Sequence, residues 1–166
     1  MVRLAAVFFF AASFCMLSAA QPPLEYQVKA AFLLNFVRFV EWPPGALEID
    51  APFNVCIAGA DPFGPVIDQI VEGESVNGHK LTVLRIKEGR QASCQVLYMA
   101  AGQAANAPGT GVLTVGEGND FIRRGGVIAF VIDSRRVRFD INLKAATGAG
   151  LKLSSKLLAV ARSIER

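Results

Sequence analysis

The sequence is poor in the side chains on which most enzyme active sites depend. His79 is the only histidine among 166 residues, and its position beside Gly78 in an expected turn favours a surface residue over a catalytic base. Zinc sites need clustered histidines and cysteines, and the chain has no such cluster. It also lacks the G-x-S-x-G nucleophile elbow and the C-x-x-C motif. We therefore predict no catalytic residue, no metal and no cofactor, and a hydrolase is the least favoured function.

Excess charge and long apolar runs are also scarce. The formal net charge is +3 and falls to +2 if Arg3 is removed, which is too little to indicate nucleic acid or an anionic membrane as a partner. The sequence has no internal repeat, no low-complexity linker and a single long apolar run, at its start. The length that follows this run suits one domain with a sizeable core.

The apolar run at the start is typical of a secretory signal peptide. Arg3 precedes an almost wholly apolar stretch, residues 4–17, and Ser18-Ala19-Ala20 supplies small residues for cleavage after Ala20. The stretch is short for a membrane span, although an uncleaved anchor is the alternative. Cleavage would remove Cys15. We expect residues 1–20 to be the signal peptide and residues 21–166 to form a single exported, soluble domain.

Residues 26–42 have the period of a helix with an unusually wide apolar face. The apolar arc covers roughly 200°, wider than on an ordinary surface helix, so two sides of the helix should find partners. Its members are Val28, Phe32, Leu33, Phe36, Val37, Phe39 and Val40. Lys29 projects into this arc. Either its side chain snorkels past the end of the helix, or it forms a buried ion pair or an interface contact. Lys29, Phe32 and Phe36 are candidates for a dimer or partner interface.

The remainder of the chain predicts an α/β fold. Short apolar segments separated by helical stretches are typical of a parallel sheet; they occupy residues 53–59, 81–86, 95–100 and 112–115. Asp61 predicts a helix N-cap, with Pro62 at the first helical position. Residues 127–132 and 137–142 flank a tight turn and predict an antiparallel hairpin. A short helix at 145–149 and a closing helix from Ser154, with Val160 and Ile164 inward, complete the chain. We expect an open mixed sheet with helices on both faces, in three layers.

Two cysteines remain after signal-peptide removal. Cys56 lies in the first strand and Cys94 begins the third, and these strands are often neighbours in a doubly wound sheet. Two cysteines in an exported protein favour a disulfide. A bridge that closes a loop of about 39 residues would stabilise the fold by about 4 kcal/mol. A structural bridge, a redox-sensitive bridge and two free thiols all remain open.

Two further segments are candidates for binding. The loop Gly59-Ala-Asp61-Pro-Phe-Gly64 follows the first strand and opens a helix, a common ligand position in α/β folds. Asp61 disfavours an anion there, and helix capping is the alternative role. The hairpin carries Asp133, Arg135, Arg136, Arg138 and Asp140, which form either the solvated face of an edge hairpin or a partner-docking edge.

Five segments resemble, in order, the signature blocks of the YfiR/HmsC-like family: YQVKAAFLLNFVRFVEWP, FNVCIAGADPFG, CQVLYMA, VLTVGEGNDFIRRGGVIAFV and RVRFDINLKAATGAGLKLSSKLLAVA. Together they extend from Tyr26 to about Ala161. The resemblance implies a periplasmic α/β domain, usually a homodimer, without enzymatic activity. It also implies a partner, the periplasmic sensor region of an inner-membrane diguanylate cyclase, which the family holds inactive. Loss of this repression raises cytoplasmic cyclic di-GMP and promotes biofilm and exopolysaccharide.

Cys56 and Cys94 match cysteines of this family, but the sequence has no further pair near the hairpin on which a second bridge could be built. Related domains also serve as sensor modules. Two functions therefore stand. The favoured one is a regulatory protein that represses a membrane cyclase, and the alternative is a periplasmic small-ligand-binding module with its pocket at Gly59, Asp61 and Gly64.

Overall fold

The computed structural model describes residues 22–87, 93–100 and 109–166. The predicted signal peptide lies outside the described residues. The elements, in chain order, are α1 (Leu24–Phe39), β1 (Val40–Glu41), β2 (Phe53–Ala58), α2 (Pro65–Val71), β3 (Ser75–Val76), β4 (His79–Ile86), β5 (Val96–Met99), β6 (Leu113–Glu117), α3 (Asn119–Arg123), β7 (Ile128–Asp133), β8 (Arg136–Asn142), α4 (Leu143–Gly148), β9 (Lys152–Leu153), α5 (Ser155–Val160) and β10 (Ser163–Glu165).

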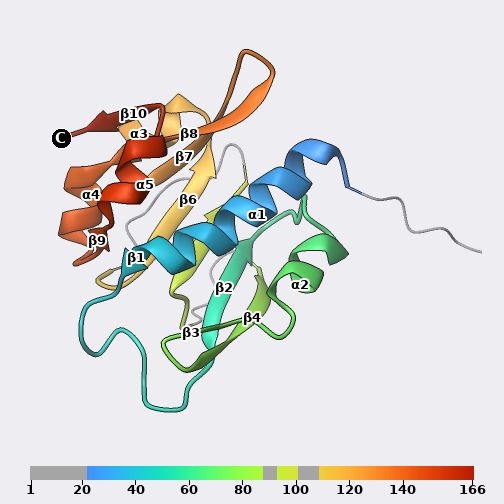
Figure 1. Ribbon diagram of the computed structural model, residues 1–166, viewed down its shortest axis with the longest axis vertical. Helices are drawn as coiled ribbons and strands as arrows, with labels where there is room; N and C mark the ends of the chain where they lie inside the picture. The colour runs from blue at the N-terminus through green and yellow to red at the C-terminus, as the bar shows by residue number, and fades with distance from the viewer. Residues whose placement is uncertain (1–21, 88–92, 101–108) are drawn as a thin grey trace, which may run out of the picture.

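One open, mixed sheet organises the protein (Figure 1). Its strand order is β10-β8-β7-β6-β5-β2-β4-β3. The strands β4, β2, β5, β6 and β7 run parallel, and β7 and β8 form the antiparallel hairpin. Both the parallel half and the hairpin confirm the predicted fold class.

Helix α1 lies along one face of this sheet and, with α2 beside it, covers the main core (Figure 1). Phe36 of α1 packs against Phe130 of β7 and Phe139 of β8, with ring centroids 5.7 and 5.0 Å apart. Phe63, from the loop before α2, packs on Tyr98 of β5 at 4.6 Å. These aromatic contacts bury a large apolar area and dominate the packing of this face.

Helix α3 forms a second, smaller core on the opposite face. Phe121 is buried there with Met99 and Ala129, and its ring lies directly over Gly116 and Gly126. A Cβ at either glycine would come within 2.3 Å of that ring, so the close approach of α3 to the sheet requires glycine at both positions. Helices on both faces make the predicted three layers.

Three predicted boundaries are wrong for identifiable reasons. Helix α1 ends at Phe39 rather than at residue 42, because Val40 and Glu41 become extended and pair with Leu153 and Lys152. Helix α2 begins at Pro65 rather than Pro62, because the Asp61 carboxylate accepts hydrogen bonds from the amides of Phe63 and Gly64 and forms a turn of its own.

The closing helix is shorter than predicted. It ends at Val160, which is 57% exposed, and residues 163–165 form β10, which pairs in parallel with β8. Ile164 therefore belongs to a strand, and the hairpin is not the edge of the sheet. Among the described helices, none is long and apolar enough to cross a membrane.

Candidate functional site at the carboxyl ends of the strands

The parallel strands β2, β5 and β6 end on the same side of the sheet, where α/β folds place their ligands. The strand order reverses here, because the chain leaves β2 for β4 on one side and returns to β5 on the other. The amino-terminal half of α1 and the tip of the β7–β8 hairpin lie at this same end of the molecule (Figure 1). Functional side chains are therefore expected at this end of the molecule.

A buried ion-pair cluster lies at its centre. Lys29 is 1% exposed. Its Nζ lies 2.5 Å from Oε1 of Glu25 and 2.7 Å from Oε2 of Glu117, and 4.5 Å from the centre of the Tyr26 ring. The Tyr98 hydroxyl donates a hydrogen bond of 2.6 Å to Oε1 of Glu117. One ammonium thus joins helix α1 to the ends of β5 and β6.

The local sequence explains how these groups meet. Glu25 and Lys29 are four residues apart on one helix, which places them on the same face. Glu117 ends the apolar strand β6, and Tyr98 lies on the neighbouring strand with Val115 as its partner in register. Because side chains alternate along a strand, Val115 and Glu117 point to the same face. The snorkelling alternative for Lys29 is wrong, and the buried ion pair is correct.

Burial and hydrogen bonding shift the pKa of two members of this cluster. Burial by itself lowers the pKa of Lys29, but the hydrogen bonds and charges of Glu117 and Glu25 outweigh it and raise the pKa above its usual value. Burial, followed by the hydrogen bond to Glu117, raises the pKa of Tyr98 far above its usual value. Both side chains therefore keep their protons in the folded protein at alkaline pH.

These shifts predict a loss of stability at high pH. The unfolded chain releases these protons near the ordinary pKa values of 10.0 for tyrosine and 10.5 for lysine, while the folded protein retains them. The contribution of both groups is therefore complete below pH 10 and declines as the pH rises above it, by up to about 1.4 kcal/mol per pH unit for each proton. We expect urea denaturation between pH 9 and 11 to show a smaller decline in Tyr98→Phe than in the wild type. Equal declines in the two proteins would contradict this assignment.

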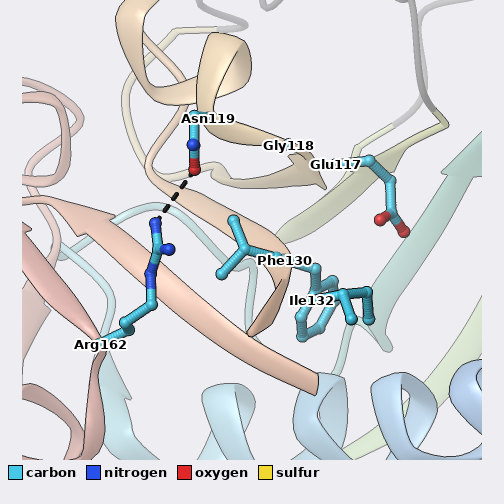
Figure 2. Close-up of a pocket in the computed structure, with 7 residues that line it drawn as sticks. Glu117, Gly118, Asn119, Phe130, Ile132 and Arg162 are labelled. Carbon is cyan, nitrogen blue, oxygen red and sulfur yellow. Dashed lines mark hydrogen bonds between the residues drawn. The ribbon is translucent and has the colours of Figure 1, made fainter. Parts of the chain in front are cut away.

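Beside the cluster is a notch with a volume of about 330 Å³. Figure 2 shows Glu117 on one side of it and Arg162 on the other, with Phe130 and Ile132 of β7 between them. Arg162 donates from Nε to Asp140 Oδ1 at 2.8 Å and from Nη2 to Asn119 Oδ1 at 3.1 Å. Glu117 and Arg162 are both held in place by partners within the protein, so the notch is preorganised. The rest of its lining is mainly apolar.

Three exposed apolar side chains belong to this same end of the protein. Leu24 is 73% exposed, Val28 is 38% exposed and Ile132 is 54% exposed. Phe32 contacts Phe130 inside the fold. Val28 is one helical turn before Phe32, and Ile132 is two residues beyond Phe130 on the same strand face. These residues therefore extend the apolar core to the surface at this end, where no described element covers them. We call Leu24, Val28 and Ile132 the apolar ledge.

The predicted interface residues are divided between the interior and the surface. Phe36 is fully buried and Lys29 nearly so, so both make contacts within the chain and neither reaches a partner. Phe32 is half-buried and packs on Phe36, Phe130 and Phe139. Arg135, Arg136 and Arg138 are exposed. Arg136 and Arg138 project from the face of the hairpin opposite to Ile132, because their register partners are Asp133 and Val131. Asp140 is buried against Arg162 and is not part of the solvated ribbon.

The predicted ligand loop is occupied by the protein's own contacts. Asp61 accepts hydrogen bonds from two loop amides and pairs with Nε of Arg85 at 2.7 Å. The carbonyl of Gly64 accepts a bond from Arg85 Nη2 at 2.9 Å, and the amide of Gly59 bonds to Ile86 at 3.1 Å. Turn formation and anchoring of α2 account for this loop, and the residues that line the notch do not include it.

Cys56 and Cys94 form a disulfide with a Cα–Cα distance of 5.8 Å, so the two-free-thiols alternative does not describe this structure. The bridge joins β2 to the start of the neighbouring β5, the adjacency predicted from the sequence. Cys56 is fully buried and Cys94 is 9% exposed.

Sequence reasoning missed Glu117, Tyr98 and Arg162. A signal for the first two was present, because a lysine inside an apolar arc requires an acidic partner, and Glu117 is the carboxylate that ends an otherwise apolar strand. No comparable signal pointed to Arg162, which follows a helix and precedes a strand that the sequence did not reveal.

The protein is thus a small α/β domain. At the carboxyl ends of its parallel strands it has an ion-pair cluster around Lys29, a notch and an exposed apolar ledge. The chain belongs to the YfiR/HmsC-like family, whose model matches residues 26–162. A comparison with curated proteins found no match.

Proposed function

We propose that this protein is a non-enzymatic regulator, exported to the periplasm after cleavage near Ala20, that represses an inner-membrane diguanylate cyclase by contact with the cyclase's periplasmic sensor region. Through this contact it would limit cyclic di-GMP and, with it, biofilm and exopolysaccharide formation. Membership of the YfiR/HmsC-like family carries the proposal. The disulfide is in keeping with an oxidising compartment.

The apolar ledge is the surface that suits such a contact. Contiguous exposed apolar side chains that are rimmed by polar residues mark protein–protein interaction sites. The ledge is bordered by the charged tip of the hairpin, with Arg135 in its turn, and a polar rim around an apolar centre is the usual arrangement of an interface. We therefore assign partner docking to Leu24, Val28 and Ile132 rather than to Phe36 and Lys29.

We also propose a homodimer, as the family resemblance implies. The wide apolar arc of α1 supports a homodimer less strongly than the sequence suggested. Leu33, Phe36 and Val37 are buried within the chain itself, against the sheet, α2 and α5. The oligomeric state can be measured directly by light scattering on the purified protein.

A deletion strain complemented with single variants tests the repressor function. Loss of the gene is expected to raise cyclic di-GMP, and the wild-type gene should restore the low level. Ile132→Asp should fail to restore it and should weaken binding to the sensor region by about tenfold or more, because a charge would have to be buried in the contact. Val160→Asp is the matched control, since Val160 is 57% exposed on α5, away from the ledge.

Both variants should remain folded, as judged by their melting temperatures, because each site is more than half exposed. Unchanged cyclic di-GMP in the deletion strain, with the candidate cyclase expressed, would contradict the repressor function. Full restoration by Ile132→Asp would leave repression standing but remove the ledge as its docking surface.

A small-ligand-binding sensor is the second candidate function. The observation in its favour is the notch between Glu117 and Arg162 (Figure 2), not the Gly59–Gly64 loop from which this function was predicted. A rise in melting temperature with a small molecule, in the absence of any protein partner, would support it.

A further inference from the structure

A second and larger hollow lies at the other end of the strands. Its volume is about 510 Å³, within the range of small-molecule sites in proteins. It lies between the starts of β6 and β7 and the short helix α4. It is thus separate from the notch, which is lined by the last residues of β6 and β7.

The walls of this hollow are built from the smallest residues. Gly109, Gly125, Gly148, Ala145 and Ala149 contribute much of the lining. A Cβ placed at any of the three glycines would meet nothing within 4 Å, whereas Gly116 and Gly126 are packed against Phe121. Gly109 and Gly125 have φ of +95° and +90°, a backbone conformation that favours glycine. Gly148 has no such constraint, and its lack of a side chain leaves room at this wall of the hollow.

The polar side chains that line the hollow are Thr110, Thr114, Asn142 and Lys144, and each carries a hydrogen-bond donor. Thr114 is 3% exposed; its hydroxyl accepts a bond from the Val127 amide at 3.0 Å, which leaves its own hydrogen to donate. The buried Asn142 accepts with its Oδ1 a hydrogen bond from the Ala145 amide, which caps α4. Its Nδ2 donates a long bond of 3.4 Å to the Ile122 carbonyl. Among the described residues that line the hollow, Lys144 carries the only charge.

We propose that this hollow binds a small organic carboxylate with an apolar body. The glycine, alanine and valine walls exclude water from the apolar part, and burial of that part supplies most of the affinity. The carboxylate oxygens accept hydrogen bonds from Thr114 and Asn142, and Lys144 neutralises the charge. Because Lys144 is the only charged side chain among the described residues of the lining, the site selects a monoanion over a neutral or cationic analogue. This site is independent of the proposed repression.

Two probes of matched shape test the site on the purified protein. Octanoate and 3-phenylpropionate are compared with 1-octanol and 3-phenylpropanol, which keep the apolar body and lack the charge. At ten times the dissociation constant, a bound carboxylate should raise the melting temperature by about 3–6 °C. Lys144→Gln should weaken carboxylate binding by about tenfold and leave the alcohols unaffected. Lys156→Gln, on α5, is the control for a lost surface charge.

Gly148→Leu tests the location. Gly148 ends α4 and is not among the glycines with positive φ. A Cβ at this position meets nothing within 4 Å, so a leucine can be placed at this wall of the hollow. We expect the variant to fold and to lose binding of the carboxylates and the alcohols alike. No thermal shift with either carboxylate would overturn the proposal. Equal binding of carboxylates and alcohols, or undiminished binding to Gly148→Leu, would overturn it as well.

Discussion

Reduction of the Cys56–Cys94 disulfide should lower the free energy of unfolding by about 4 kcal/mol and the melting temperature by about 8–16 °C. The two cysteines are 38 residues apart, and breaking the bridge frees this loop in the unfolded chain while the folded protein keeps its contacts. Denaturation with and without a reductant measures the difference.

The double variant Cys56→Ala, Cys94→Ala is the matched control for that experiment. It removes the bridge without placing a hydroxyl in the fully buried position of Cys56, and its stability should equal that of the reduced wild type to within about 1 kcal/mol for the small change in packing. A reduced protein as stable as the oxidised one would show that the bridge is not structural. Two alkylatable thiols in the oxidised protein would show that it does not form.

Replacement of Lys29 is the second change with a large expected effect. Lys29→Met should lower the free energy of unfolding by about 3–5 kcal/mol, because it leaves the largely buried Glu117 carboxylate without its cation. Urea denaturation at pH 7 measures this loss. Arg38→Met is the matched control on the same helix: its pair with Glu74 is exposed, with side chains 47% and 35% accessible, so its loss should cost less than about 1 kcal/mol.

The double variant Lys29→Met, Glu117→Gln separates the lost ion pair from the lost packing. Without the Glu117 carboxylate, the unpaired carboxylate left in the cluster is that of Glu25, whose side chain is 41% accessible to solvent, so part of the stability should return. If Lys29→Met alone stays within about 1 kcal/mol of the wild type, the cluster does not hold α1 to the ends of β5 and β6.

Most of the sheet could be predicted, because its strands satisfy local rules. Continuous apolar runs such as the one around Val55 and Ile57 indicate strands buried on both faces, and the turn at Ser134 and Arg135 lies between two alternating segments. The sequence did not reveal β10, because Ile164 is an isolated apolar residue in a charged segment. Only its pairing with Ile141 makes it a strand.

The candidate site was predicted less well. The wide apolar arc of α1 correctly indicated a helix with partners on two sides, but the sequence could not say whether those partners belong to this chain or to another. The structure buries Phe36, a predicted interface residue, inside the fold. It exposes Val28 and Ile132, which were not predicted as interface residues. Exposure depends on where the sheet ends, and that end is not a local property of α1.

What the sequence determined by itself, then, is the class of fold, the family and the placement of Cys56 and Cys94 on strands expected to be neighbours; the bridge between the two cysteines is shown by the structure. Each of the three rests on the types and order of residues along the chain. Only the tertiary structure decided that Lys29 is paired with Glu117, 88 residues away, that the Gly59–Gly64 loop is filled by Arg85, and that the hollow beside α4 is open. These contacts join segments remote in sequence, and their distances are set by the packing of whole elements rather than by local propensity.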